Sequence, residues 1–198
     1  MVNKLPDQFE CPVDRVILRF IDSHLFAYHQ LGFSPNMVTT LSLLTGLSAA
    51  YLLLVGLHYG LAALLYLLAY YLDSVDGKLA RAYNQVTVFG DYYDHFSDTA
   101  KFMAVLYALY ENRTRRLTGR QTFFQYFIVG LSVLTLLHFG YAEVIYGGNE
   151  SPSLAPLKYV AGLDANPMER IQLTKYFGNG TLTLVLVLGI LLWDQRRI

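Results

Sequence analysis

Residues 73–98 read D-S-V-D-G-K-L-A-R-A-Y-N-Q-V-T-V-F-G-D-Y-Y-D-H-F-S-D, and this is the most informative stretch of the chain. Asp73 and Asp76 are three residues apart, so on a helix their side chains share one face. Asp94 and Asp98 are four residues apart and form a second stripe of the same kind. Two antiparallel helices joined by the short segment between these pairs would bring both acidic stripes together.

Glycine and arginine residues accompany the acidic stripes. Gly77 follows Asp76 and has no side chain, which would let a ligand approach the backbone closely. Arg81 lies one turn further along, where its guanidinium is placed to meet a phosphate group. In the second stripe, Gly90 precedes Asp94 by four residues. The pattern therefore indicates a site for a phosphate-bearing ligand between two helices.

The composition around this stretch is that of a membrane protein. The 198 residues are 54% hydrophobic and only 15% charged, whereas soluble domains carry about 25% charged residues. The net charge is zero, which gives no indication of a nucleic-acid partner. The single cysteine, Cys11, excludes an internal disulfide and a cysteine-based metal cluster. We therefore expect an integral, multi-pass membrane protein in contact with the lipid bilayer.

The apolar runs predict an all-α fold, a polytopic transmembrane helical bundle of five to six spans. Five candidate spans are visible, at 37–57, 61–82, 91–110, 123–146 and 176–193. The second is apolar only to residue 72, which is shorter than the roughly 20 residues a span needs, so its helix must continue through the aspartates. Helical apolar spacing over 13–28 predicts an amphipathic interfacial helix. The expected domains are an N-terminal juxtamembrane region, 1–33, and a transmembrane domain, 34–198.

Four carboxylates at one end of a membrane bundle cannot all be ionised unless a cation neutralises them. Ionisable groups in a membrane protein are costly and indicate a functional site by default. Ligation by carboxylate oxygens alone suits Mg²⁺ or Mn²⁺ far better than zinc. Two such ions would clamp a diphosphate and stabilise the charge that develops in phosphoryl transfer. The alternative interpretation is four solvated aspartates at helix ends.

The spacing of these residues resembles the signature of the CDP-alcohol phosphotransferases. That signature is D-x2-D-G-x2-A-R, seven or eight residues, then G-x3-D-x3-D, and residues 73–98 fit it at every fixed position with a gap of eight. Residues 35–39, P-N-M-V-T, are similar to the P-N-x-x-T at the start of the family's first span. The resemblance implies a membrane enzyme, usually with six spans in its core and expected to be a homodimer.

The resemblance also implies a role for each matching position. Asp73, Asp76 and Asp94 would bind metal, and Asp98 would complete a second metal site and act as general base on the acceptor hydroxyl. The CDP portion of the donor would be held by Asn36, Thr39, Gly77, Arg81 and Thr87. The implied reaction transfers a phosphatidyl group from CDP-diacylglycerol to a small polar alcohol and releases CMP. The active site is expected at the cytoplasmic face of the endoplasmic reticulum or the bacterial inner membrane.

Two features point to different subgroups of the family. The stretch 157–175, L-K-Y-V-A-G-L-D-A-N-P-M-E-R-I-Q-L-T-K, is similar to the phosphatidylinositol synthase loop. That similarity favours an inositol-type acceptor and places Lys158, Arg170 and Lys175 on the acceptor side, although each could instead be an interfacial cation. His95, directly after Asp94, is similar to the choline and ethanolamine phosphotransferases, which use CDP-choline or CDP-ethanolamine with diacylglycerol.

Two non-enzymatic interpretations remain open, a cation transporter and an inactive relative of the family that serves as a scaffold. Transporters commonly contain a repeated half and helices broken near the midplane. This chain has no visible repeat, and its acidic residues cluster at one membrane end. An intact Asp98 argues against an inactive relative. We therefore expect an enzyme rather than a transporter or a scaffold.

Overall fold

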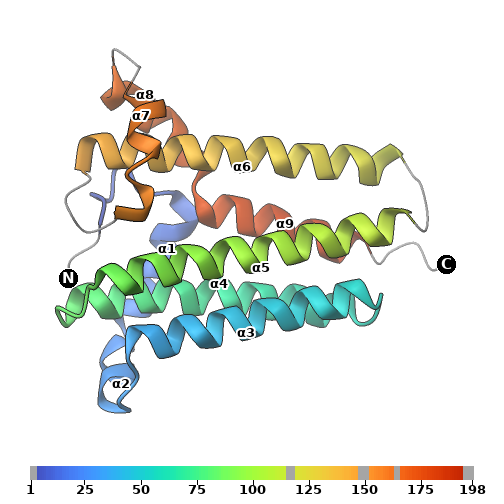
Figure 1. Cartoon of the computed structure of the whole chain (residues 1–198), viewed down its shortest axis with the longest axis horizontal. Helices are drawn as coiled ribbons and strands as arrows, with labels where there is room; N and C mark the ends of the chain where they lie inside the picture. Colours follow the sequence, from blue (N-terminus) through green and yellow to red (C-terminus); the bar gives the residue numbers. More distant parts are fainter. Residues whose placement is uncertain (1–3, 115–118, 147–151, 163–165, 194–198) are drawn as a thin grey trace.

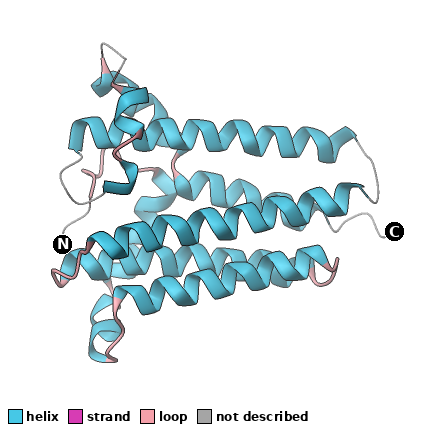
Figure 2. Ribbon diagram, viewed as in Figure 1, coloured by secondary structure: helices cyan, strands magenta, loops and turns pink. Residues whose placement is uncertain are grey.

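Five long helices lie side by side in the computed structural model, which describes residues 4–114, 119–146, 152–162 and 166–193 (Figure 1). These are α3 (Pro35–Leu54), α4 (Tyr59–Ala82), α5 (Val88–Thr114), α6 (Gly119–Tyr146) and α9 (Asn179–Trp193). No strand occurs among the described residues (Figure 2). The prediction of an all-α helical bundle is confirmed.

The shorter helices gather at one end of the bundle, where α4 ends and α5 begins (Figure 1). They are α1 (Pro12–Asp22), α2 (Leu25–Gln30), η1 (Pro152–Leu154), α7 (Leu157–Ala161), α8 (Pro167–Thr174) and η2 (Lys175–Phe177). Because both acidic stripes lie towards this end, the short helices surround the part of the bundle that carries them. We call it the site end.

Local sequence signals set the boundaries of the long helices. The Ser34 side chain accepts a hydrogen bond from the backbone N–H of Met37, and Pro35 takes the first helical position of α3, where its missing N–H costs nothing. The turn into α4 contains Gly56 and His58, both with positive φ. Asn84, also with positive φ, turns the chain between α4 and α5, which makes these two helices antiparallel.

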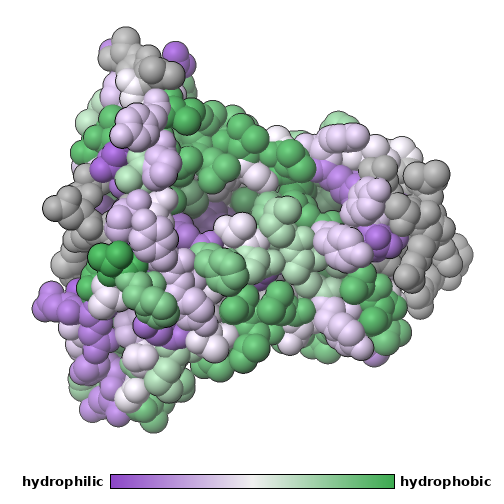
Figure 3. Space-filling view, viewed as in Figure 1, coloured by the Kyte–Doolittle hydropathy of each residue, from purple (hydrophilic) through white to green (hydrophobic). Residues whose placement is uncertain are grey.

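Three helical segments are long and apolar enough to cross a membrane: Pro35–Leu54, Gln121–Tyr146 and Pro167–Trp193. The other two long helices, α4 and α5, carry the acidic stripes, which lower their hydropathy. Hydrophobic side chains dominate the middle of the bundle, and hydrophilic ones lie mostly towards its ends (Figure 3). The chain is therefore an integral membrane protein. That α4 and α5 also cross the membrane stays a prediction.

The predicted amphipathic helix over 13–28 is present but divided in two, because the chain turns at Ser23 and His24. On α1, Ile21 is fully buried while Val16 and Phe20 are exposed. An ion pair between Lys78 and Asp22 joins α1 to α4. This arrangement leaves apolar side chains on the outer face of α1, as expected for a helix at a membrane surface.

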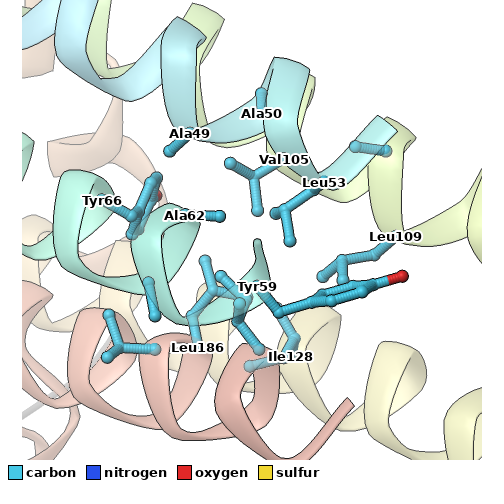
Figure 4. Close-up of a cluster of buried hydrophobic side chains, with 14 of the residues drawn as sticks. Ala49, Ala50, Leu53, Tyr59, Ala62, Tyr66, Val105, Leu109, Ile128 and Leu186 are labelled. Atoms are coloured by element: carbon cyan, nitrogen blue, oxygen red, sulfur yellow. The ribbon is translucent and has the colours of Figure 1, made fainter. Parts of the chain in front are cut away.

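The main core fills the space among α3, α4, α5, α6 and α9 (Figure 4). Leu53, Tyr66, Val105, Ile128 and Leu186 are members, one from each helix. Along the bundle, α3 packs closely against both α4 and α5, whereas α4 and α5 approach each other closely at few positions. The acidic stripes therefore face each other across a gap that α3 borders.

The junction between α1 and α9 has no room for a side chain at Gly180. A Cβ there would lie 2.8 Å from the Cβ of Val13 and 2.7 Å from the carboxylate of Asp14. We expect Gly180→Ala to destabilise the protein by about 1–3 kcal/mol, measured by thermal unfolding in detergent. Gly130→Ala is the matched control, because nothing lies within 4 Å of the Cβ position at Gly130. Equal melting temperatures for the two variants would contradict this packing.

Candidate active site

A cavity of about 290 Å³ opens at the site end of the bundle. Its walls come mainly from α3, α4, α5 and α6, with contributions from α1, η1 and α9. The segment before α1 adds Lys4, Leu5 and Glu10. The space-filling view is hollowed in this region, between α5 and α6 (Figure 3). The N-terminal region thus forms part of the candidate site, a role that its sequence did not suggest.

Three of the four predicted metal ligands meet inside the cavity. One carboxylate oxygen from each of Asp73, Asp76 and Asp94 lies within 4.8 Å of the other two. The helical spacing on α4 and the antiparallel run of α5 produce this group, as the sequence predicted. The Oδ1 atom of Asp94 is buried without a hydrogen-bond partner among the described residues. Because a buried carboxylate oxygen needs a partner, the group fits a divalent cation with oxygen ligands.

Asp98 lies deeper in the bundle and has a different partner. The Nζ atom of Lys101 is 2.7 Å from Asp98 Oδ1 and donates a hydrogen bond of 2.7 Å to Asp73 Oδ1. Sequence reasoning missed Lys101. A lysine three residues after Asp98, in the interior of a predicted span, was the signal that could have found it.

All five residues predicted to hold the CDP portion line the cavity: Asn36, Thr39, Gly77, Arg81 and Thr87. Thr39 donates a hydrogen bond of 2.6 Å from Oγ1 to Asp76 Oδ2, which joins α3 to the acidic group. Thr87 accepts a hydrogen bond of 2.9 Å from the backbone N–H of Gly90 and so caps the start of α5.

The two glycines of the signature lie where side chains would obstruct the cavity wall. A Cβ at Gly77 would be 3.2 Å from the guanidinium of Arg81, and a Cβ at Gly90 would be 3.3 Å from the side-chain oxygen of Asn36.

Residues 33–193 match the family model of the CDP-alcohol phosphatidyltransferases. The chain belongs to the CDP-alcohol phosphatidyltransferase family.

Other comparisons add little to the family assignment. An uncharacterised protein of Aquifex aeolicus (strain VF5) is 44% identical over 88 residues. That stretch covers 41% of this chain and 44% of the relative, so the match spans less than half of either. No solved structure matches the chain. The resemblance to the phosphatidylinositol synthases within the CDP-alcohol phosphatidyltransferase family stays a prediction.

The three residues predicted on the acceptor side do not line the cavity. Lys158 is 3.9 Å from Glu143 Oε2, Lys175 donates a hydrogen bond of 3.0 Å to the backbone oxygen of Gln8, and Arg170 is exposed on α8. The cavity wall nearest to them carries Lys4 and Glu143, which form an ion pair of 2.5 Å. The geometry therefore gives no support to a direct role for these three cations.

His95 lines the cavity but is held by α5 and η1 rather than by Asp94. Its Nδ1 atom is 2.8 Å from the backbone oxygen of Asp91 and 3.0 Å from Ser153 Oγ. Asp91 in turn accepts a hydrogen bond of 2.9 Å from the backbone N–H of Ser153. Through these contacts His95 holds η1 against α5 beside the cavity, whether or not it also contacts a substrate.

Thr39 should tune the affinity of the acidic group for metal, because its hydrogen bond orients Asp76. Removing such a partner typically costs about 10–100-fold in metal affinity. We therefore expect Thr39→Val to weaken Mn²⁺ binding by about that factor, measured by titration of the purified protein. Thr45→Val is the control, because the Thr45 hydroxyl donates its hydrogen bond to the backbone oxygen of Leu41 on its own helix. A dissociation constant that is the same in both variants would contradict the role of Thr39.

Two carboxyls of the N-terminal region, those of Glu10 and Asp14, are partly buried in the cavity wall. Burial raises the pKa of Asp14, which accepts a hydrogen bond from the Tyr70 hydroxyl. Burial also raises the pKa of Glu10 to about 7, with a further contribution from Asp14. Arg81 and Arg15 act in the opposite direction on the pKa of Glu10.

The raised pKa of Glu10 makes stability depend on pH. Between pH 4.5 and about 7 the folded protein keeps a proton on Glu10 that the unfolded chain has lost, so raising the pH destabilises the fold. We expect Glu10→Gln to be more stable than the unsubstituted protein at pH 8, by about 2–3 kcal/mol, and to lose this advantage near pH 4.5. Thermal unfolding of both proteins across this range measures the difference. A stability difference that does not change with pH would contradict the assignment.

Proposed function

We propose that this chain is a membrane enzyme that transfers a phosphatidyl group from CDP-diacylglycerol to a polar alcohol and releases CMP. The observation that carries the proposal is the group of Asp73, Asp76 and Asp94 oxygens within 4.8 Å of one another. This group opens into a cavity lined by every signature position predicted to hold CDP. A solvated acidic patch would not bring these features together.

The chemistry requires positioning and charge neutralisation above all. A divalent ion, Mg²⁺ by preference or Mn²⁺, held by Asp73, Asp76 and Asp94 supplies charge neutralisation for the diphosphate of the donor. Arg81 lines the same cavity, where its guanidinium would pair with a phosphate of the donor. Asn36 and Thr87 would hold the remainder of the nucleotide from α3 and the start of α5.

The transfer itself is a displacement at phosphorus. Asp98 accepts the proton of the acceptor hydroxyl, and the freed oxygen attacks the phosphorus that carries the diacylglycerol. The bond between this phosphorus and the bridging oxygen breaks, and that oxygen leaves with CMP. Because the donor has acyl chains, its reacting diphosphate must lie at the membrane surface, which agrees with a site at one end of the bundle.

For the acceptor we propose a neutral polyol of the inositol type. The cavity wall beyond the aspartates contains Glu10, Asp14 and the Lys4–Glu143 ion pair, which offer both donors and acceptors to hydroxyl groups. The cations that would bind an acceptor phosphate, Arg170 and Lys175, lie outside this wall. A phosphate-free polyol is therefore favoured over an inositol phosphate or glycerol 3-phosphate.

A second candidate is an aminoalcohol phosphotransferase, which uses CDP-choline or CDP-ethanolamine with diacylglycerol. The observation in its favour is the acidic character of the same wall, where Glu10 and Asp14 could face an ammonium group. His95 lines the cavity, which agrees with its similarity to the choline and ethanolamine phosphotransferases.

We propose the cytoplasmic face as the location of the site and a homodimer as the assembly, both by analogy with the family.

Release of CMP by the purified protein in Mg²⁺ separates these possibilities. With CDP-diacylglycerol as donor, we expect release that depends on inositol and is weaker with inositol phosphate, glycerol 3-phosphate or serine. Release only from CDP-choline or CDP-ethanolamine, with diacylglycerol, would replace the first candidate by the second. If no donor and acceptor pair released CMP, the proposed activity would be wrong.

A further inference from the structure

A buried ammonium group lies inside the acidic cluster. Lys101 is 5% exposed, and its Nζ atom is 2.7 Å from both Asp73 Oδ1 and Asp98 Oδ1. The same atom donates a hydrogen bond of 2.6 Å to Ser42 Oγ on α3. The ammonium therefore donates hydrogen bonds to Ser42 and Asp73 and forms an ion pair with Asp98, so that it lies between two carboxylates.

The surroundings of Lys101 are built to hold it. Its stem packs against Gly46, where an added Cβ would be 2.9 Å from the Cβ of Lys101, so a larger residue would displace the lysine. Ser42 donates its own proton to the backbone oxygen of Ala69, at 2.8 Å, which leaves the lone pairs of its Oγ for the ammonium. This lysine does not extend towards the membrane surface, as lipid-facing lysines commonly do.

The depth of these residues in the bundle separates two cation positions. On α4 the chain runs towards the site end and on α5 away from it, so Asp73 and Asp98 lie deeper than Asp76 and Asp94. Lys101 follows Asp98 by three residues on α5 and lies deeper still, and its ammonium contacts both Asp73 and Asp98. The carboxylate oxygens that lie within 4.8 Å of one another belong to Asp73, Asp76 and Asp94, and Asp98 is not a member of this group.

We propose that the ammonium of Lys101 occupies the second cation position of the cluster, so that the nucleotide-free protein binds a single divalent ion. This inference rests on the proposed metal site. A second divalent ion between Asp73 and Asp98 would have to displace the ammonium from both carboxylates and would be repelled by its charge. Asp98 is then fixed by Lys101 rather than by metal, and Lys101 is a positioning residue for the general base.

Titration of the purified full-length protein with Mn²⁺, in detergent and without nucleotide, tests the inference by electron paramagnetic resonance. We expect one bound ion per chain, and two spin-coupled ions in Lys101→Met, which keeps the stem but removes the charge. Lys78→Met is the matched control: Lys78 is also buried, at 2% exposure, but pairs with Asp22 outside the cluster, so its variant should bind one ion.

Asp98→Asn provides an independent readout, because an aspartate that is not a ligand can be replaced without loss of the ion. We expect this variant to bind one ion, as the unsubstituted protein does. Two ions in the unsubstituted protein, one ion in Lys101→Met, or loss of an ion in Asp98→Asn would each overturn the inference while leaving the proposed function intact. If the unsubstituted protein bound no ion, the metal site on which the proposed function depends would also be wrong.

Discussion

Asp98→Asn is expected to lower CMP release by about 10²–10⁴-fold, the usual contribution of a general base. The asparagine has nearly the same shape but cannot accept the proton of the acceptor hydroxyl. The substitution would also remove the negative charge that pairs with Lys101 at 2.7 Å. Initial rates of CMP release at saturating donor and acceptor measure the effect on the chemical step.

Binding of the donor provides the control for this variant. The substitution changes none of the residues proposed to hold CDP, which are Asn36, Thr39, Gly77, Arg81 and Thr87. The dissociation constant for CDP-diacylglycerol in Mg²⁺ should therefore change little. A variant that retained more than about a tenth of the activity would exclude Asp98 as the base.

Asp94→Asn is expected to abolish CMP release by removing one of the three carboxylates that meet within 4.8 Å. Each ligand contributes charge as well as geometry, so the remaining pair should hold Mn²⁺ much more weakly. We expect a loss of at least about 10³-fold in activity at millimolar Mg²⁺, comparable to the loss of a main electrostatic contribution to transition-state stabilisation. Mn²⁺ titration and CMP release should fall together.

Asp91→Asn is the matched control for this variant, since Asp91 is on the same helix and lines the same cavity. Its carboxylate binds the backbone N–H of Ser153, at 2.9 Å, and lies outside the metal group. This variant should bind Mn²⁺ as the unsubstituted protein does. Equal losses of Mn²⁺ affinity in the two variants would contradict the assignment of the ligands.

Much of the site could be predicted from sequence because its determinants are local. The three- and four-residue spacings fix which aspartates share a helix face, and the short turn at Asn84 makes α4 and α5 antiparallel. The apolar runs gave the five long helices, and the continuation of α4 through its aspartates to Ala82 is confirmed. Periodicity and turn residues carry this information without any knowledge of tertiary contacts.

The remaining features depend on contacts between segments far apart in the chain. The roles of Lys101 and Ser42 follow from the packing of α5 against α3, across 59 residues. Lys4 and Glu10 reach the cavity because the N-terminal region docks against α6 and α9, which no local pattern indicates. Lys158 and Lys175 were placed by resemblance alone, and their observed partners are Glu143 and Gln8.

The most direct test of the account is release of CMP from CDP-diacylglycerol by the purified protein, with and without inositol, in Mg²⁺ and again after chelation. The account predicts release that requires both the alcohol and the metal, with a phosphatidyl product in equal amount. Release that persisted without the alcohol or after chelation would contradict it, as would an inactive protein that still bound the donor and one ion.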